Sequence, residues 1–180
     1  MKVHMRRGLL TLFFSFLIFA NMQAKALEIE NYKLDTDDII SVNIYDEPEL
    51  SLKEVRVSSQ GTITMPLIGQ VVVKGFNLRE IEQKIIKMYK GDYLKNPDVS
   101  IAIKEYRQFY VNGEVNKPGG YNYREGMTVQ RAITLAGGFT NRAKRDDVVI
   151  TENSQEKQRK VKLSFKIQPG DVITVEESFF

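Results

Sequence analysis

Residues 77–103, NLREIEQKIIKMYKGDYLKNPDVSIAI, place a helix signal directly before a strand signal. Asn77 with Glu80 three residues later is the pattern of a capped helix start, and Gly91 is a natural helix stop. Between them, apolar residues recur at the spacing of one helical face: Leu78, Ile81, Ile85 and Met88. Residues 99–103 then alternate apolar and polar with the period of a strand. This combination predicts a fold of the α+β class.

Short strands are predicted on the N-terminal side of this helix. Ile40, Val42 and Ile44 alternate with polar residues, as in a strand with one buried face. Further extended segments are expected at 55–57, 62–65 and 71–73, separated by turn residues. Together with the helix they predict a first small mixed domain that ends near Arg107.

A second small mixed domain is predicted for the rest of the chain. Thr128 caps a short helix with apolar residues on one face, and Gly137-Gly138 ends that helix. Strand signals lie on both sides of the helix, at 109–111, 121–123, 148–151, 160–165 and 172–175.

One local pattern occurs twice. Tyr32-Lys33-Leu34 precedes Asp38 by three intervening residues, and Phe165-Lys166-Ile167 precedes Asp171 by the same interval. Each copy combines an apolar anchor, a tight polar turn and a strand, and the aspartate can accept hydrogen bonds from nearby backbone amides. We interpret both copies as structural.

Residues 1–26 have the pattern of a secretory signal peptide. A basic start is followed by the 12-residue run Leu9–Ala20 and by small residues at Ala24 and Ala26. The alternative is a retained membrane anchor, but a membrane-spanning helix needs roughly 20 apolar residues. We therefore expect cleavage after Ala26, with no transmembrane helix in the mature chain.

The basic charge of the chain belongs to this leader. The whole chain has 26 basic and 23 acidic residues, and residues 1–26 contain four of the basic ones and none of the acidic ones. The mature protein is therefore close to neutral, which argues against nucleic acid as a partner. Cysteine is absent, so neither disulfides nor a lipid-modified cysteine anchor are expected.

The residue types argue against an enzyme. The single histidine, His4, lies in the leader, so the mature chain has no Ser/His or Cys/His pair and no histidine or thiolate metal ligand. We therefore predict no catalytic, cofactor-binding or metal-binding residues, and we expect no cofactor. Acidic residues at 37–38 and 46–49 leave a carboxylate-based glycan hydrolase as a third hypothesis, tested at Asp46 or Glu47. Turn residues and a solvated acidic loop explain them better.

Aromatic and basic residues gather where the two domains meet. Exposed tyrosine rings pack against sugar rings while the hydroxyl groups form hydrogen bonds. Strand alternation buries about half of such rings, so each one is also a candidate core residue. The candidate polymer contacts, with an acidic polymer as one option, are Tyr106, Arg107, Tyr110, Tyr121, Tyr123 and Arg124.

Taken in order, these segments resemble the bacterial polysaccharide export protein family over nearly all of the mature chain. In the first part the resemblance rests on segments 32–34, 38–40, 45–50 (YDEPEL), 61–63, 66–69, 96–99 and 104–106. In the second part, segments 111–115, 117–119, 135–138 and 169–173 resemble a soluble-ligand-binding β-grasp (SLBB) module. Behind the predicted signal peptide at 1–26, the resemblance implies a polysaccharide-export N-terminal domain at 27–107 and a β-grasp-like SLBB domain at 108–180.

The resemblance also implies a function without bond chemistry. The mature protein is expected to form a homo-oligomeric ring around a passage for polysaccharide, together with an inner-membrane polysaccharide co-polymerase or chain-length protein. Many members carry a lipid anchor, further modules and a final membrane-crossing helix, whereas this sequence stops at Phe180. We therefore expect a periplasmic short form, associated with the outer membrane and working beside a separate outer-membrane pore. The alternative is a monomeric periplasmic saccharide-binding module.

One departure from the family pattern lies in the first turn. Thr36-Asp37-Asp38 stands where the family usually has Pro-Gly-Asp, so this turn is expected to differ in detail.

Overall fold

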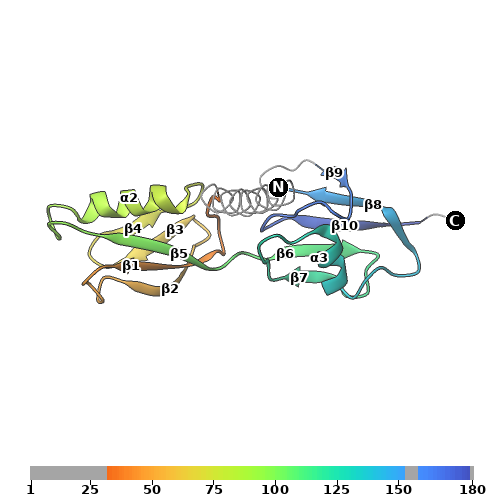
Figure 1. Ribbon diagram of the computed structural model, residues 1–180, viewed down its shortest axis with the longest axis horizontal. Helices are drawn as coiled ribbons and strands as arrows, with labels where there is room; N and C mark the ends of the chain where they lie inside the picture. The colour runs from red at the N-terminus through yellow and green to blue at the C-terminus, as the bar shows by residue number, and fades with distance from the viewer. Residues whose placement is uncertain (1–31, 153–157, 179–180) are drawn as a thin grey trace, which may run out of the picture.

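The computed structural model describes residues 32–152 and 158–178, arranged as two domains that lie end to end in an elongated molecule (Figure 1). The predicted signal peptide lies outside the described residues. Each domain has a hydrophobic core of its own, and both combine sheets with one helix. The predicted α+β fold class is confirmed.

The first domain is built around a three-stranded antiparallel sheet in the order β2-β1-β5. Its strands are β1 (Ile39–Ile44), β2 (Leu52–Arg56) and β5 (Val99–Glu105). A separate hairpin is formed by β3 (Thr62–Met65) and β4 (Gly69–Val72). Helix α2 (Leu78–Tyr89) packs beside β5 and contributes to the same core.

The start of α2 confirms the predicted cap. The Asn77 side chain accepts a hydrogen bond from the Glu80 amide at 2.9 Å, and the Glu80 carboxylate accepts one from the Asn77 amide at 2.8 Å. Ile81 and Ile85 are buried, as predicted, but the third fully buried residue of the helix is Tyr89. Its hydroxyl donates to the Pro66 carbonyl at 2.7 Å, so the helix turns Tyr89 inward and leaves Met88 only half-buried.

Removing this cap has a measurable cost. We expect Asn77→Ala to lower the free energy of unfolding by about 1 kcal/mol, because the side-chain oxygen that accepts the hydrogen bond from the Glu80 amide is lost. Urea unfolding followed by circular dichroism measures the change. Asn96→Ala, at an exposed loop position, serves as the control. Equal stability of the two variants would contradict a capping role.

The second domain places five strands in one sheet, in the order β7-β6-β10-β8-β9. They are β6 (Phe109–Gly113), β7 (Gly119–Tyr121), β8 (Ala143–Thr151), β9 (Gln158–Val161) and β10 (Val172–Glu177). The central strands β6 and β10 are parallel, and the other pairs are antiparallel. Helix α3 (Val129–Leu135) follows β7 and is capped by Thr128, as predicted. The β-grasp-like character of this domain stays a prediction.

Two strands of this domain end earlier than expected. Strand β7 stops at Tyr121, so Tyr123 lies beyond it. Strand β9 stops at Val161, although the sequence favours a strand to residue 165. The carbonyls of Leu163 and Phe165 instead accept hydrogen bonds from the first backbone amides of α3, which have no partner within the helix.

The repeated sequence pattern forms the same local structure twice. In the first copy the Asp38 carboxylate accepts a hydrogen bond from the Asp35 amide at 2.9 Å. In the second, the Asp171 carboxylate accepts one from the Gln168 amide at 2.7 Å. Both aspartates are buried, and each stands directly before a core strand. The structural interpretation of the repeat is therefore confirmed.

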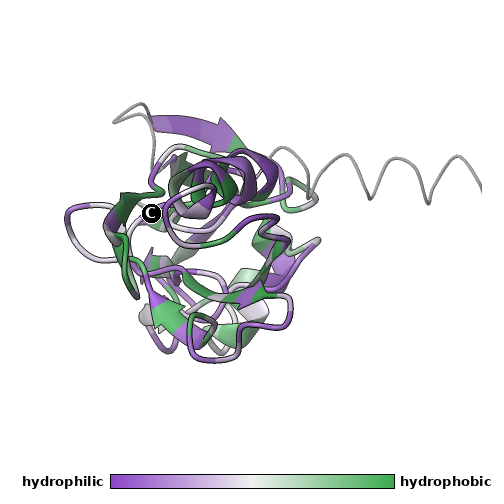
Figure 2. Cartoon of the chain, turned by 90° about the vertical axis from the view of Figure 1, so that its left-hand side faces the viewer, coloured by the Kyte–Doolittle hydropathy of each residue, from purple (hydrophilic) through white to green (hydrophobic). Residues whose placement is uncertain are grey.

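Figure 2 shows the molecule from the end formed by the first domain, with both apolar and polar stretches along its ribbon. In β1, for example, Ile40, Val42 and Ile44 are buried while Asn43 is exposed. The two hydrophobic cores are separate, so the contacts between the domains are made by residues outside both cores, at the junction.

Candidate functional site

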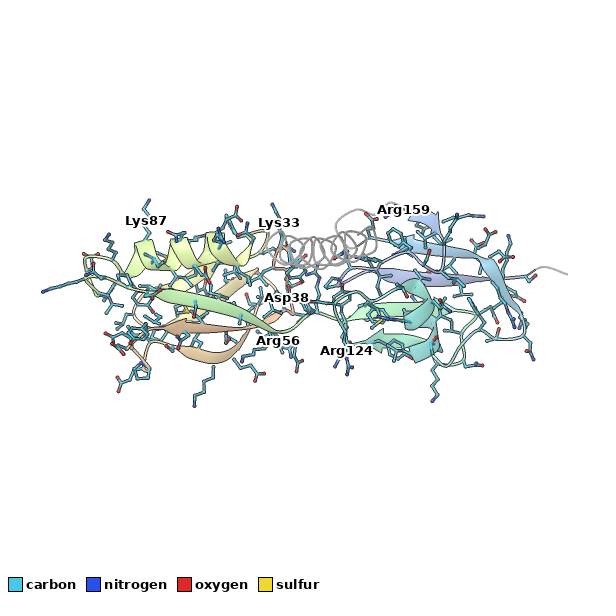
Figure 3. The ribbon with its side chains drawn as sticks, in the orientation of Figure 1. Lys33, Asp38, Arg56, Lys87, Arg124 and Arg159 are labelled. Atoms are coloured by element: carbon cyan, nitrogen blue, oxygen red, sulfur yellow. The ribbon has the colours of Figure 1, made fainter. Side chains whose placement is uncertain are left out.

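Asp38 is the central group of the junction between the two domains (Figure 3). Its carboxylate is fully buried. Besides the Asp35 amide, it accepts hydrogen bonds from the Tyr32 hydroxyl at 2.8 Å and from the Arg107 amide at 2.8 Å. A buried carboxylate needs such donors, since an unpaired charge away from water is costly. The turn before β1 is therefore tied to the segment that leaves β5.

Arg107 supplies the positive charge that pairs with Asp38. Its Nη1 lies 3.1 Å from an Asp38 carboxylate oxygen and donates to the Tyr32 hydroxyl at 2.6 Å. The guanidinium carbon lies 5.8 Å from the centre of the Tyr32 ring. Only 15% of the Arg107 side chain is exposed. The charge of Arg107 is thus used inside the junction.

Three tyrosine rings connect the domains across this ion pair. Tyr106 lies between Tyr32 of the first domain and Tyr123 of the second, in edge-to-face contacts with centroid distances of 5.0 and 5.3 Å. The Tyr106 hydroxyl also donates to the Glu125 carboxylate at 3.0 Å. Such aromatic pairs contribute about 0.5–1.5 kcal/mol each beyond the area they bury. The row fixes the two domains relative to one another.

The junction keeps its phenols protonated. Burial raises the pKa of Tyr32 above its ordinary value of 10.0, and the adjacent Asp38 carboxylate raises it further. Burial also raises the pKa of Tyr106, with a further contribution from its hydrogen bond to Glu125. Both hydroxyls therefore remain hydrogen-bond donors in the folded protein when the solution becomes alkaline.

The pKa of Tyr32 is higher in the folded protein than in the unfolded chain, and this difference predicts a loss of stability at high pH. Above about pH 10 the unfolded chain gives up the Tyr32 proton while the folded chain keeps it, so rising pH favours unfolding. One such group contributes a slope of about 1.4 kcal/mol per pH unit. In Tyr32→Phe we expect the free energy of unfolding to fall less steeply between about pH 10 and 11. The difference in slope corresponds to about one proton fewer released on unfolding.

Urea unfolding at a series of pH values measures that slope. Tyr45→Phe, at a ring that is 68% exposed, should keep the wild-type slope. An unchanged slope in Tyr32→Phe would show that Tyr32 is not the group responsible.

A cleft of about 460 Å³ opens beside this junction. Its walls come from both domains and combine aromatic, amide, hydroxyl and charged side chains. The lining residues are Thr36, Asp37, Arg56, Glu105, Tyr106, Arg107, Gln108, Tyr110, Asn122 and Gly170. We call this space the junction cleft. Figure 3 shows Arg56 and Arg124 along one edge of the molecule, on either side of the junction.

A smaller hollow of about 280 Å³ lies on another side of the junction, and Arg107 lines both spaces. Its rim includes Lys33, Lys74 and Glu152. Lys74 is paired with Asp35 at 2.6 Å, and Glu152 is paired with Arg159. The junction cleft is the larger of the two spaces, and its lining includes two tyrosines whereas that of the smaller hollow includes no aromatic residue.

The structure separates the six predicted contact residues into two groups. Tyr106, Arg107 and Tyr110 line the junction cleft. The other three do not: Tyr121 stacks on Phe109 with 5.9 Å between centroids and donates its hydroxyl to the Lys117 carbonyl, Tyr123 packs on Tyr106, and Arg124 is exposed. Whether any of the six contacts polymer stays a prediction.

Two polar residues of this cleft were not among the predicted contacts. Gln108 and Asn122 both line it, and the Gln108 amide nitrogen donates to the Asn122 side-chain oxygen at 3.2 Å. One signal was available: Gln108 directly precedes β6 and is two residues from Tyr110, and side chains at this spacing lie on the same side of an extended chain.

The two acidic segments are held apart. Asp37 and Asp38 precede β1 and Asp46 follows it, so a strand of six residues, about 20 Å in length, separates them. Glycosidase carboxyl pairs lie about 5–9.5 Å apart, so these segments do not supply such a pair between them. Among the described residues no three potential ligands are grouped to hold a metal ion, and none of the described helices has the length and apolarity to cross a membrane.

Comparisons with known proteins match both parts of the chain. A family model described as polysaccharide biosynthesis/export protein matches residues 27–104, and the model of the SLBB domain matches residues 108–162. The exopolysaccharide production protein ExoF of Rhizobium meliloti is 29% identical over 136 residues, covering 67% of this chain and 32% of ExoF. The EPS I polysaccharide export outer membrane protein EpsA of Ralstonia solanacearum is 28% identical over 133 residues, covering 60% of this chain and 35% of EpsA. The chain thus spans about a third of the length of these relatives.

Proposed function

The chain belongs to the polysaccharide biosynthesis/export protein family, with an SLBB domain after the export domain, and from this premise we propose that it is a component of a bacterial exopolysaccharide or capsule export complex. In this role the mature protein assembles into a homo-oligomeric ring and encloses a hydrated passage through which the polymer moves. The observation that carries the proposal is the succession of both family models along one chain.

The junction gives a physical reason why such a protomer suits a passage. A wall built from copies of one chain keeps its width only if each copy keeps its shape. Here a row of three tyrosines and the hydrogen bond from Tyr106 to Glu125 hold the two domains end to end. Closed symmetry then lets a small chain surround a space much larger than itself. Polar loops and clefts along the wall offer weak, exchangeable hydrogen bonds, so that the polymer slides.

The location and partners follow from the same proposal. The relative EpsA is named an outer membrane protein, and we propose a periplasmic position beside the outer membrane for this chain. Its partners would be the polysaccharide, an inner-membrane chain-length protein and a separate outer-membrane pore. The proposed role needs neither a cofactor nor nucleic acid, and it involves no enzymatic step.

Deletion of the gene tests the proposal in the cell. We expect the deletion strain to lose surface polysaccharide and to regain it when the wild-type gene is restored. Native mass measurement of the purified mature protein should show a closed oligomer. Normal surface polysaccharide in the deletion strain would overturn the export role, and a monomer at cellular concentration would overturn the ring.

A second candidate is a monomeric saccharide-binding module. The junction cleft favours it, because the whole cleft lies within one protomer and needs no second copy. Saturable oligosaccharide binding by a protein that stays monomeric at high concentration would support this alternative over the ring.

A further inference from the structure

We propose that the junction cleft binds uncharged sugar units of the polymer in preference to uronates, and that Tyr110, Gln108 and Asn122 form its binding surface. This inference rests on the proposed function, because that function makes polysaccharide the ligand class. The binding surface and the preference for uncharged units follow from the geometry and charge of the cleft.

The cations of the cleft are already matched by carboxylates. Arg107 is paired with the buried Asp38. Arg56 lies 3.9 Å from the Asp37 carboxylate and donates to the Asp37 carbonyl at 3.3 Å. Glu105 adds a further negative charge to the lining, with no ion pair to another described residue. A uronate entering the cleft would therefore meet at least as much negative as positive charge, and gains no net attraction.

The remaining lining groups suit a neutral pyranose. Tyr110 is 46% exposed in the cleft wall, so its ring offers a surface for the C–H face of a sugar. The Gln108 and Asn122 amides are bonded to each other at 3.2 Å, which holds them in place. Each amide nitrogen carries two N–H groups, and this bond uses only one of the four. The others can donate to neighbouring hydroxyl oxygens of a sugar.

Gly120 provides the space in which this surface lies. It pairs with Tyr110 across the β6–β7 hairpin. A Cβ atom at Gly120 would lie 2.6 Å from the Gln108 side-chain oxygen and 3.0 Å from Cε1 of the Tyr110 ring. The φ angle of Gly120 is not in the left-handed region, so its backbone does not require glycine. The missing side chain is what lets the ring and the amide lie across β7.

Titration of the mature protein with tetrasaccharides tests the inference. The ligands are cellotetraose, maltotetraose and laminaritetraose, which are neutral, and tetragalacturonate, which is acidic. We expect at least one neutral ligand to shift the backbone NMR signals of residues 108–110 and 120–122. Tetragalacturonate should bind these residues more weakly at low salt. Tighter binding of tetragalacturonate, or no shift at these residues with any neutral ligand, would overturn the proposal.

Variants show whether the proposed surface is responsible. Tyr110→Ala is expected to weaken neutral binding about tenfold, since stacking contributes on the order of 1.4 kcal/mol. Gly120→Ala should weaken it as well, because the methyl group displaces Tyr110 and Gln108. Tyr45→Ala removes an exposed ring beyond the far end of β1 and should bind like the wild type. Wild-type affinity in a folded Tyr110→Ala variant would contradict the assignment.

Complementation separates this inference from the proposed function. If deletion of the gene leaves surface polysaccharide unchanged, the export role fails, whereas the titration still decides the cleft. If deletion removes the polysaccharide and the neutral ligands do not bind, the inference about the cleft fails alone. Tyr110→Ala in the restored gene is expected to lower surface polysaccharide below the wild-type amount, whereas Tyr45→Ala restores it fully.

Discussion

Asp38→Asn is expected to lower the free energy of unfolding by about 3–5 kcal/mol. The substitution keeps the size of the side chain but removes the charge that faces Arg107 in the buried junction. An unmatched guanidinium then remains where water cannot reach it fully. Urea unfolding monitored by circular dichroism measures the loss, and a lower melting temperature should accompany it.

Asp37→Asn is the matched control for this prediction. It removes the same charge one residue earlier, where 73% of the side chain is exposed. Asp37 has a φ angle of 69°, and asparagine tolerates this left-handed conformation well. We expect a change within about 0.5 kcal/mol. If the two variants were equally stable, the buried ion pair would not hold the junction.

Gly113→Ala is expected to destabilise the second domain by about 3 kcal/mol or more. Gly113 has a φ angle of 82° and pairs with Val175 in the parallel ladder between β6 and β10. A Cβ atom there would overlap the Val175 carbonyl oxygen, which accepts a hydrogen bond from the Glu114 amide at 3.0 Å. The three nearest atoms, the O, C and N of Val175, all belong to the backbone, so the two central strands must move apart.

Gly126→Ala separates the two contributions to that loss. Gly126 has a φ angle of 72°, but a Cβ atom there would meet nothing within 4 Å. This variant therefore carries only the conformational cost, about 1–2 kcal/mol. Thermal unfolding of both variants gives the comparison. A loss in Gly113→Ala no greater than in Gly126→Ala would mean that the sheet accommodates the methyl group.

Most of the helices and strands could be predicted from local sequence patterns. The cap of α2 depends on residues three positions apart, and the strands on alternation within a few residues, so both can be recognised from sequence. The repeated aspartate turn was predictable for the same reason. The order of strands in each sheet depends on distant pairing, such as the parallel contact of β6 with β10, which no local pattern reports.

The candidate site was predictable in location but only partly in detail. Tyr106, Arg107 and Tyr110 do line a cleft at the domain junction. The role of Arg107 could not be read from its neighbours in sequence, because its partner Asp38 is 69 residues away. Tyr32, which accepts a further hydrogen bond from Arg107, is 75 residues away. An arginine that looked available to an acidic polymer is therefore neutralised within the fold.

The position of Arg107 also decides where the first domain can be cut. A fragment that ends at Glu105 keeps every strand of the first sheet. It nevertheless loses the Arg107 amide and guanidinium, two of the donors that satisfy Asp38. Cleavage two residues beyond that point keeps both. Soluble, autonomous pieces of this half are thus expected only when the cut falls after Arg107.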